Sequence, residues 1–251
     1  MHSVLPDPDQ VSLAAADVVS EAVVAGTTTL GLATGSSPQG AYAELARRVQ
    51  AGRLSLAGCR AFLLDEYVGL PADHPQAYRT VIRRDLVDRV DLDPGRVHGP
   101  DGTADDLEQE ARRYEREVVE AGVELQVLGI GRNGHLGFNE PGSPLDSVTR
   151  LVRLTERTRA DNARFFGSPD QVPTEVLTQG LGTILQARRL LLIATGQAKA
   201  AAVAAALTGP VTPDCPASVL QRHPDVVVLL DPAAASLLPP APAPSSPSRP
   251  S

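Results

Sequence analysis

The chain contains no tryptophan, one methionine and only four residues each of tyrosine and phenylalanine. Because aromatic residues make up 3% of its 251 positions, alanine, valine and leucine must fill the interior. Its two cysteines, Cys59 and Cys215, are too few for a disulfide framework and lack the spacing of metal ligands. No apolar run reaches the roughly 18–20 residues of a membrane span, and the first twenty residues lack the pattern of a signal peptide. These absences predict a soluble, cytoplasmic protein with reduced thiols.

Lysine is almost absent, since all of the 23 basic residues except Lys199 are arginine. The net charge of −7 and the isoelectric point near 5.2 argue against a nucleic-acid-binding surface or a polybasic membrane patch. A single lysine in such a composition can be chance. It also offers a compact point charge on a thin stem, which suits a phosphate or a narrow site better than arginine does.

Apolar, β-branched segments alternate with segments of helical periodicity along most of the chain. Strands are predicted at residues 27–33, 59–64, 125–129, 188–194 and 225–231, with a weaker strand pattern at 149–154. Helices are predicted at residues 9–25, 38–50, 76–90, 104–121 and 197–207. This order predicts an α/β fold with a single open, largely parallel sheet and helices on both faces, a Rossmann-like three-layer αβα arrangement. We expect one domain over residues 1–238 and a disordered Pro/Ser/Ala-rich tail over residues 239–251.

Two loops of similar sequence each follow a predicted strand and begin a helix. The first loop is made of small residues, namely Thr34, Gly35, Ser36 and Ser37. It leaves backbone N–H groups free at a helix N-terminus, where an anion can bind, although an ordinary serine-capped turn has the same sequence. The second loop runs from Thr195 and Gly196 to Lys199, a cation in a first helical turn that an anionic ligand would stabilise. Two such loops on one sheet favour a phosphorylated substrate. The P-loop motif G-x-x-x-x-G-K-[ST] is absent from the sequence, which speaks against a nucleoside triphosphatase.

Acidic and imidazole side chains follow two other predicted strands. Asp65 and Glu66 are adjacent carboxylates that cannot share one environment, so we expect one to face the cleft as a candidate general base, unless both belong to a solvated turn. A glycine-rich turn holds Asn133 and His135, with Glu140 five residues further on. His135 can exchange protons near neutral pH, although a lone histidine is more often structural. No second histidine stands at ligand spacing and no G-x-S-x-G is present, so we predict neither a metal site nor covalent catalysis.

Three motifs carry a resemblance to a known family: LDEYVGL, GIGRNGHLGFNEPGS, and TRADNARFF followed by VPTEVLTQGLGTIL. The chain resembles the glucosamine-6-phosphate deaminase family from about residue 31 to residue 231. The related 6-phosphogluconolactonases share the phosphate loop and a G-x-G-x-D-G-H core, but after the histidine they typically continue toward a Ser-Leu-Phe-Pro type of sequence. Here the sequence continues in the deaminase form, with Phe138, Asn139, Glu140 and Pro141.

The resemblance implies conversion of glucosamine 6-phosphate and water to fructose 6-phosphate and ammonia, with no metal and no organic cofactor. It implies that His135 opens the sugar ring and that Asp65 moves the C2 proton to C1. Asn133 and Glu140 would orient His135 or relay protons. The implied phosphate ligands are Thr34, Gly35, Ser36, Ser37, Arg164 and Lys199, and residues 154–176 resemble the family's mobile lid. The expected partner is a small-molecule sugar phosphate, with no nucleic acid and no membrane, and a homo-oligomer is left open.

Three positions depart from the pattern of the family. Asn133 stands where many members have aspartate and cannot take a proton, so any relay must run through Glu140. Ser36 replaces a common glycine, with a modest expected effect on the loop. Val152 stands two residues after Arg150, where members activated by N-acetylglucosamine 6-phosphate are expected to have lysine. We therefore do not expect this kind of activation here.

Two other functions fit parts of the same sequence. A 6-phosphogluconolactonase shares the fold, but hydrolysis of a lactone needs no base for a carbon acid, so Asp65 and Glu140 speak against it. A non-catalytic sugar-phosphate sensor would need a helix-turn-helix in the same chain or a partner that carries one. The residues before the first predicted strand contain no lysine or arginine, which speaks against DNA binding by this chain. A sensor could also dispense with Asp65 and His135, both of which are present.

Overall fold

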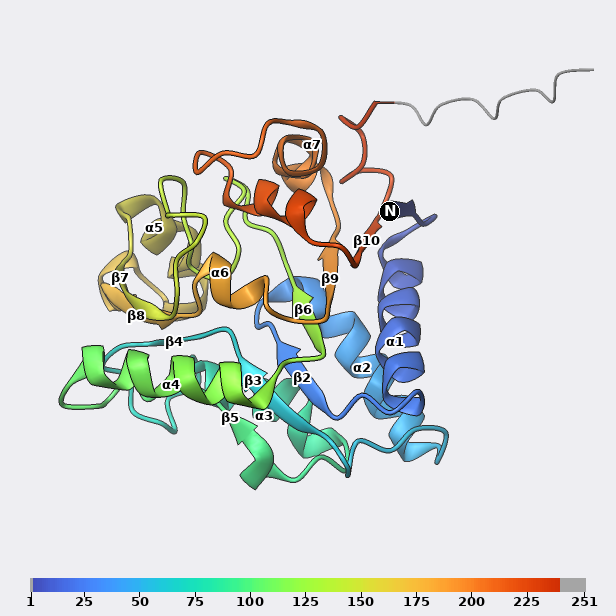
Figure 1. The fold of residues 1–251 in the computed structure, drawn as a ribbon, viewed down its shortest axis with the longest axis horizontal. Helices are drawn as coiled ribbons and strands as arrows, with labels where there is room; N and C mark the ends of the chain where they lie inside the picture. The colour runs from blue at the N-terminus through green and yellow to red at the C-terminus, as the bar shows by residue number, and fades with distance from the viewer. Residues whose placement is uncertain (1, 240–251) are drawn as a thin grey trace, which may run out of the picture.

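Seven parallel strands form the central sheet of the molecule (Figure 1). The computed structural model describes residues 2–239, so the predicted tail lies outside the described residues except for Pro239. In spatial order the strands are β1 (His2–Val4), β10 (Val226–Leu230), β9 (Arg189–Ala194), β6 (Leu125–Leu128), β2 (Thr29–Leu32), β3 (Arg60–Leu63) and β5 (Val97–His98). Each strand runs parallel to its neighbours. The predicted α/β fold with a largely parallel sheet is confirmed.

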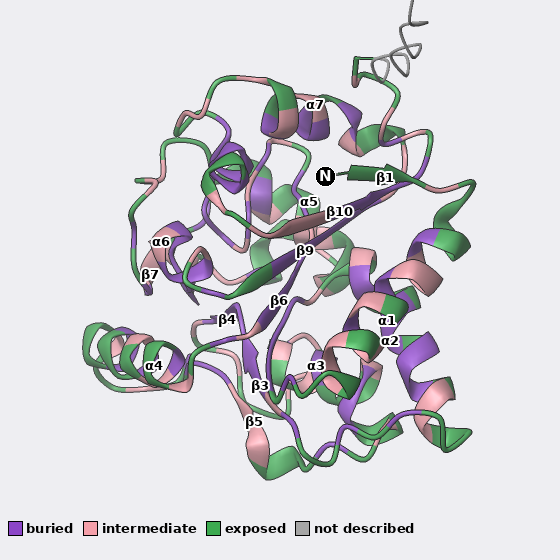
Figure 2. Ribbon diagram, turned by 45° about the vertical axis from the view of Figure 1, so that its right-hand side comes forward, coloured by how far each residue is buried: buried purple, intermediate pink, exposed green. Residues whose placement is uncertain are grey.

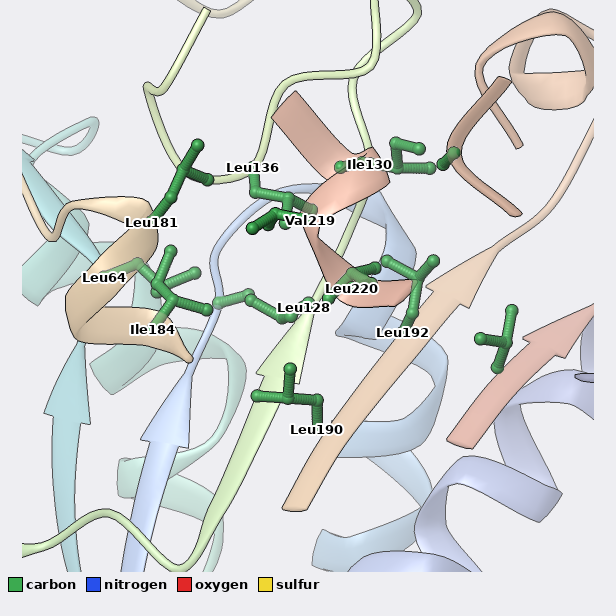
Figure 3. Close-up of a cluster of buried hydrophobic side chains, with 14 of the residues drawn as sticks. Leu64, Leu128, Ile130, Leu136, Leu181, Ile184, Leu190, Leu192, Val219 and Leu220 are labelled. Atoms are coloured by element: carbon green, nitrogen blue, oxygen red, sulfur yellow. The ribbon is translucent and has the colours of Figure 1, made fainter. Parts of the chain in front are cut away.

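Helices cover both faces of this sheet, because successive side chains of a strand point to opposite sides. On β9, Leu191 and Ile193 belong to the buried cluster that includes helices α1 (Pro8–Val24), α2 (Ser36–Gln50) and α3 (Tyr78–Asp85). Leu190 and Leu192 belong to the cluster on the other face, with helices α4 (Leu107–Ala121), α6 (Leu181–Ile184) and α7 (Ala200–Thr208) and the 3-10 helix η5 (Pro216–Arg222). Figure 3 shows this second cluster, and Figure 2 shows the buried strands between the helical layers. A strand that is covered on both sides is apolar along nearly its whole length, which is why the inner strands could be predicted from the sequence.

The predicted helices 9–25 and 38–50 match α1 and α2 to within two residues at each end, and the other three differ more. The predicted helix 76–90 is interrupted at Leu86, whose φ of −136° is not helical, and continues as the 3-10 helix η1 (Val87–Arg89). Helix α4 begins at Leu107 because the Asp106 side chain caps it by accepting the Gln109 N–H at 2.8 Å. The predicted helix 197–207 begins as the 3-10 helix η4 (Gln197–Lys199) before α7. A further 3-10 helix, η2 (Pro94–Arg96), leads into β5.

A second, antiparallel sheet stands beside the carboxyl end of β3 (Figure 1). It contains, in spatial order, β4 (Asp65–Tyr67), β8 (Glu175–Thr178) and β7 (Arg150–Arg153). Strand β7 matches the weaker pattern at 149–154, whereas β4 and β8 were not predicted. Helix α5 (Glu156–Phe166) and the 3-10 helix η3 (Pro169–Gln171) connect β7 to β8. The small sheet therefore joins Asp65 to the segment expected to form a lid.

Candidate active site

The loops after β2, β3, β6 and β9 meet at one edge of the sheet, where the carboxyl ends of the strands lie. With helices α3 and α5 they line an open cavity of about 250 Å³. Eight of the ten predicted site residues line this cavity: Thr34, Gly35, Ser36, Ser37, Asp65, His135, Arg164 and Lys199. Asn133 and Glu140 do not line it, although both lie close to residues that do.

The first small-residue loop leaves a helix N-terminus open to the cavity. Gly35 has φ +94°, a conformation that favours glycine, and it precedes the first turn of α2. No side chain of the described residues caps this end of α2, and its first turn contains no acidic residue. The backbone N–H groups of Ser36 and Ser37 and the partial positive charge of the helix therefore face the cavity, an arrangement suited to an anion.

The second predicted anion loop is occupied by a carboxylate of the protein itself. The Gly196 N–H donates to both Oδ atoms of Asp231 at 3.0 Å, and Asp231 also accepts the Ala234 N–H at 2.7 Å. Thr195 and Gly196 do not line the cavity. The prediction of a second backbone anion site was wrong, because the pairing of β9 with β10 brings Asp231 to this turn. The side chain of Lys199 alone reaches the cavity from this loop, and its Nζ donates to the Ile130 carbonyl at 2.6 Å.

Arg132 and Arg164 line the cavity near Lys199 and form a cationic cluster with it. Burial lowers the pKa of Lys199, and the positive charges of Arg132 and Arg164 lower it further, while Asp161 opposes them. Arg164 comes from α5 and lies 4.7 Å from the Phe165 ring centroid. Such a concentration of positive charge is costly by itself and is relieved by a bound anion. Sequence reasoning missed Arg132 and Asp161 as cavity residues. The signal for Arg132 was its place in the glycine-rich turn, directly before Asn133.

The two adjacent carboxylates occupy different environments, as the sequence predicted. Asp65 lines the cavity and is 5% exposed, and no donor among residues 2–239 bonds to its carboxylate. Burial raises its pKa well above the ordinary value, and the charge of Glu66 adds to the effect. Glu66 points away and accepts the backbone N–H groups of Tyr67, Tyr78 and Arg79 at 2.8–3.0 Å. Burial raises the pKa of Glu66 as well, although these three hydrogen bonds oppose the shift. Glu66 thus holds the start of α3 while Asp65 faces the cavity.

Glycines let the backbone pass closely around the imidazole of His135. A Cβ on Gly131 would lie 2.2–2.4 Å from the ring atoms, and Gly134 has φ +83°. The Asn133 Oδ1 accepts the backbone N–H of His135 at 3.3 Å, so it fixes the main chain rather than the ring. The Nδ1 atom of His135 is buried without a hydrogen-bond partner among the described residues. Burial, followed by the charge of Lys199, lowers the pKa of His135 to about 4, so the ring is neutral at pH 7.

Glu140 contacts helix α5 instead of His135. Its Oε1 accepts hydrogen bonds from the hydroxyl groups of Thr158 and, at 3.2 Å, Thr155. No hydrogen bond joins Glu140 to His135 in the described part of the chain. Orientation of His135 by a direct hydrogen bond from Glu140, one of the two roles that the resemblance implies for Glu140, therefore has no counterpart in this structure.

Helix α5 lies over the cavity and is fastened to the small sheet. Its cavity-lining residues are Thr158, Asp161, Asn162, Arg164 and Phe165. Asn162 Nδ2 donates to the Tyr67 hydroxyl at 3.0 Å, and the Phe166 ring meets the Tyr67 ring edge-on at 5.4 Å. The segment that the sequence marked as a lid thus forms one wall of the cavity.

Neither a metal-binding cluster nor a membrane-spanning helix is present in residues 2–239. No group of three or more His, Cys, Asp or Glu residues in this range is placed to hold a metal ion. No helix in it is both long and apolar enough to cross a membrane.

Comparison with known proteins places this chain in a family. A sequence model described as "Glucosamine-6-phosphate isomerases/6-phosphogluconolactonase" matches residues 6–228. A protein of Rhodococcus opacus named glucosamine-6-phosphate deaminase is 57% identical over 232 residues, which are 92% of this chain and 90% of that protein. One from Mycolicibacterium smegmatis with the same name is 55% identical over 238 residues, 94% of this chain and 91% of that protein.

Solved structures agree with the sequence comparison. One described as a monomeric glucosamine-6-phosphate deaminase superposes with a TM-score of 0.92 at 43% identity and covers 94% of this chain and 99% of its own. A 6-phosphogluconolactonase from Trypanosoma brucei has a TM-score of 0.76 at 23% identity, covers 95% of this chain and 98% of its own, and shares the fold. The chain belongs to the glucosamine-6-phosphate isomerase and 6-phosphogluconolactonase family.

Proposed function

We propose that this protein converts glucosamine 6-phosphate and water to fructose 6-phosphate and ammonia. The observation that carries the proposal is Asp65, a buried carboxylate at the wall of a cavity that also contains a cationic cluster and an open helix N-terminus. A carboxylate in that place can take a proton from carbon while the cations hold a phosphate. The relatives at 55–57% identity bear the name of this deaminase, which supports the same reading.

The substrate's phosphate would occupy the cationic end of the cavity. In this proposal the ligands are the first-turn N–H groups and hydroxyl groups of the loop, together with two side chains: Thr34, Gly35, Ser36, Ser37, Arg164 and Lys199. Arg164 presents a planar fork of donors and Lys199 a compact charge, so the two grip different oxygens of one group. A phosphate dianion here compensates the like charges that lower the pKa of Lys199.

His135 would open the pyranose ring of the bound sugar. Because its pKa is lowered to about 4, the imidazole is neutral at pH 7 and can accept the proton of the anomeric hydroxyl. The imidazolium then gives this proton to the ring oxygen, the bond between that oxygen and C1 breaks, and the electron pair left by the anomeric proton forms the aldehyde at C1. Asn133 assists by fixing the backbone of His135 through its N–H.

Asp65 would then move one proton along the open-chain sugar. The ionised carboxylate takes the proton from C2, and the electron pair of that bond forms the double bond between C1 and C2. The π pair of the C1 carbonyl moves to O1, which takes a proton from water and becomes a hydroxyl group. Return of the proton to C1 leaves an iminium at C2, to which water adds, and ammonia departs as the ketone forms. The raised pKa of Asp65 makes its ionised form a stronger base than an exposed aspartate.

Helix α5 would act as a lid over these steps. It contributes Thr158 and Arg164 to the cavity wall. Its contacts with Tyr67 are one hydrogen bond, from Asn162, and one ring contact, with Phe166. Opening of residues 154–176 would admit the sugar, and closure would exclude bulk water from the iminium.

Release of ammonia from glucosamine 6-phosphate by the purified protein in EDTA tests the proposal. We expect release in EDTA, and loss of turnover by about 10²–10⁴-fold in Asp65→Asn, which should still bind fructose 6-phosphate in calorimetry. Asp73→Asn, an exposed aspartate outside the cavity, is the matched control and should keep the wild-type rate. No ammonia from the wild-type protein, with hydrolysis of 6-phosphogluconolactone instead, would replace the proposal by the lactonase.

Two expectations from the sequence stay predictions, and the oligomeric state stays open. Addition of N-acetylglucosamine 6-phosphate to the same assay should not change the rate, because Val152 supplies no cation for its phosphate. Metal and organic cofactors should have no effect on the rate. Sedimentation of the protein decides between a monomer and a homo-oligomer, and one solved relative is described as monomeric.

A further inference from the structure

Glu140 is a buried carboxylate whose hydrogen bonds all come from the lid helix. It is 8% exposed and does not line the cavity. Among the described residues, the donors to its side chain are the hydroxyl groups of Thr155 and Thr158, and both bond to the same atom, Oε1. A carboxylate with so little exposure depends on such donors, because an unpaired buried acceptor is costly.

The two threonines occupy defined places at the start of α5. Thr155 is the N-cap residue, and its hydroxyl accepts the backbone N–H of Thr158 at 3.2 Å. Thr158 is 5% exposed and lines the cavity, so it stands between the cavity and Glu140. The carboxylate therefore lies beside the positive end of an 11-residue helix as well as two hydroxyl donors.

We infer that Thr158, supported by Thr155, is a positioning residue that fixes the carboxylate of Glu140 for catalysis only while α5 is docked on the small sheet. The inference rests on the proposed deamination and adds a residue and a coupling to it. Both donors to Oε1 are part of the lid, so displacement of α5 removes them together and leaves Oε1 without a protein partner. Closure of the lid and orientation of Glu140 are then one event.

Removal of the hydroxyl of Thr158 is the direct test. Thr158→Val keeps the shape of the side chain and should lower kcat by about 10- to 100-fold, the range for a lost hydrogen bond to a charged group, with a smaller change in KM. Thr158→Ser restores the hydroxyl and should return kcat to within about threefold of wild type. Wild-type kcat in Thr158→Val would overturn the inference.

A double-mutant cycle distinguishes positioning of Glu140 from a general loss of lid stability. Glu140→Met keeps the length of the side chain and removes the acceptor, so Thr158→Val should add little in that background. Tyr67→Phe is the matched control, because it removes a lid hydrogen bond, from Asn162, without contact to Glu140, and its effect should add to that of Glu140→Met. Additive effects of Thr158→Val and Glu140→Met would overturn the inference.

Amide hydrogen exchange gives a readout that does not depend on activity. Thr158→Val should speed exchange in residues 156–166, and in the Glu140→Met background it should have no further effect. Thr174→Val is the control, because it makes the same change at an exposed position just before β8, and it should leave the exchange of residues 156–166 unaltered. If the wild-type protein releases no ammonia, the proposed function fails, and this cycle still decides the inference, since equal exchange in wild type and Thr158→Val would refute it.

Discussion

The neutral imidazole of His135 should make the protein less stable as the pH falls. The unfolded chain binds a proton at this histidine below its ordinary pKa of 6.5, whereas the folded protein does not until about pH 4. Between these values the unfolded state binds more protons, so the stability is present above pH 6.5 and is lost as the pH falls toward 4.

The size of the effect follows from the two pKa values. For 6.5 and about 4, linkage gives a loss of roughly 2 kcal/mol between pH 7.5 and pH 5. The imidazole is partly exposed to the cavity, so we expect about 1–2 kcal/mol. Asp65 acts in the opposite direction, because its raised pKa removes stability as the pH rises. A comparison of two proteins that both contain Asp65 isolates the part due to His135.

Urea unfolding of wild type and His135→Gln at pH 7.5 and pH 5.0 measures this difference. The variant should lose about 1–2 kcal/mol less than wild type between the two pH values. His2→Gln, at an exposed histidine of β1, is the control and should follow wild type. Equal losses in wild type and His135→Gln would refute the argument that burial keeps this ring neutral.

Three further predictions concern the cavity and its supports. Lys199→Met should raise KM for glucosamine 6-phosphate by about tenfold or more with little change in kcat, because it removes one charge from the proposed phosphate site. Steady-state kinetics measure this change, and an equal loss of kcat/KM on unphosphorylated glucosamine would contradict the prediction. Gly131→Ala places a Cβ 2.2–2.4 Å from atoms of the His135 ring and should displace the ring, so kcat should fall by about 10- to 100-fold at an unchanged melting temperature. A wild-type kcat in this variant would show that catalysis does not depend on the observed position of the ring. Glu66→Ala leaves three backbone N–H groups without their acceptor and should lower the free energy of unfolding by about 1–3 kcal/mol, which an unchanged urea midpoint would disprove.

The long inner strands could be predicted from the sequence, and the short strands could not. Strand β9 lies between two helical layers, and after the exposed Arg189 its other five residues are all apolar and buried. Such a run is a clear strand signal in the sequence. Strand β4 has three residues, and two of them are acidic, so its pattern is that of a polar turn. It forms because β8 pairs with it from about 110 residues further along the chain, and no local signal reports such a partner.

The cavity residues that follow strands were found from their loops, whereas contacts made by docking were not. Asp65 and Lys199 each follow a recognisable strand. The contact of Glu140 with Thr158 depends on where α5 lies, and 18 positions of sequence separate the two residues. Likewise, Asp231 reaches Gly196 because Leu230 is paired with Ala194. The register between two strands cannot be predicted from the sequence of either strand alone.

The two edges of the central sheet are its shortest strands. β1 has three residues and β5 has two, whereas the five strands between them have four to six. An edge strand presents unpaired N–H and C=O groups, and a long flat edge can recruit a strand from another molecule. Edges of two or three residues offer too few hydrogen bonds to hold an added strand. The apolar interior strands are thus flanked at both margins of the central sheet by strands too short to pair stably with a strand of another molecule.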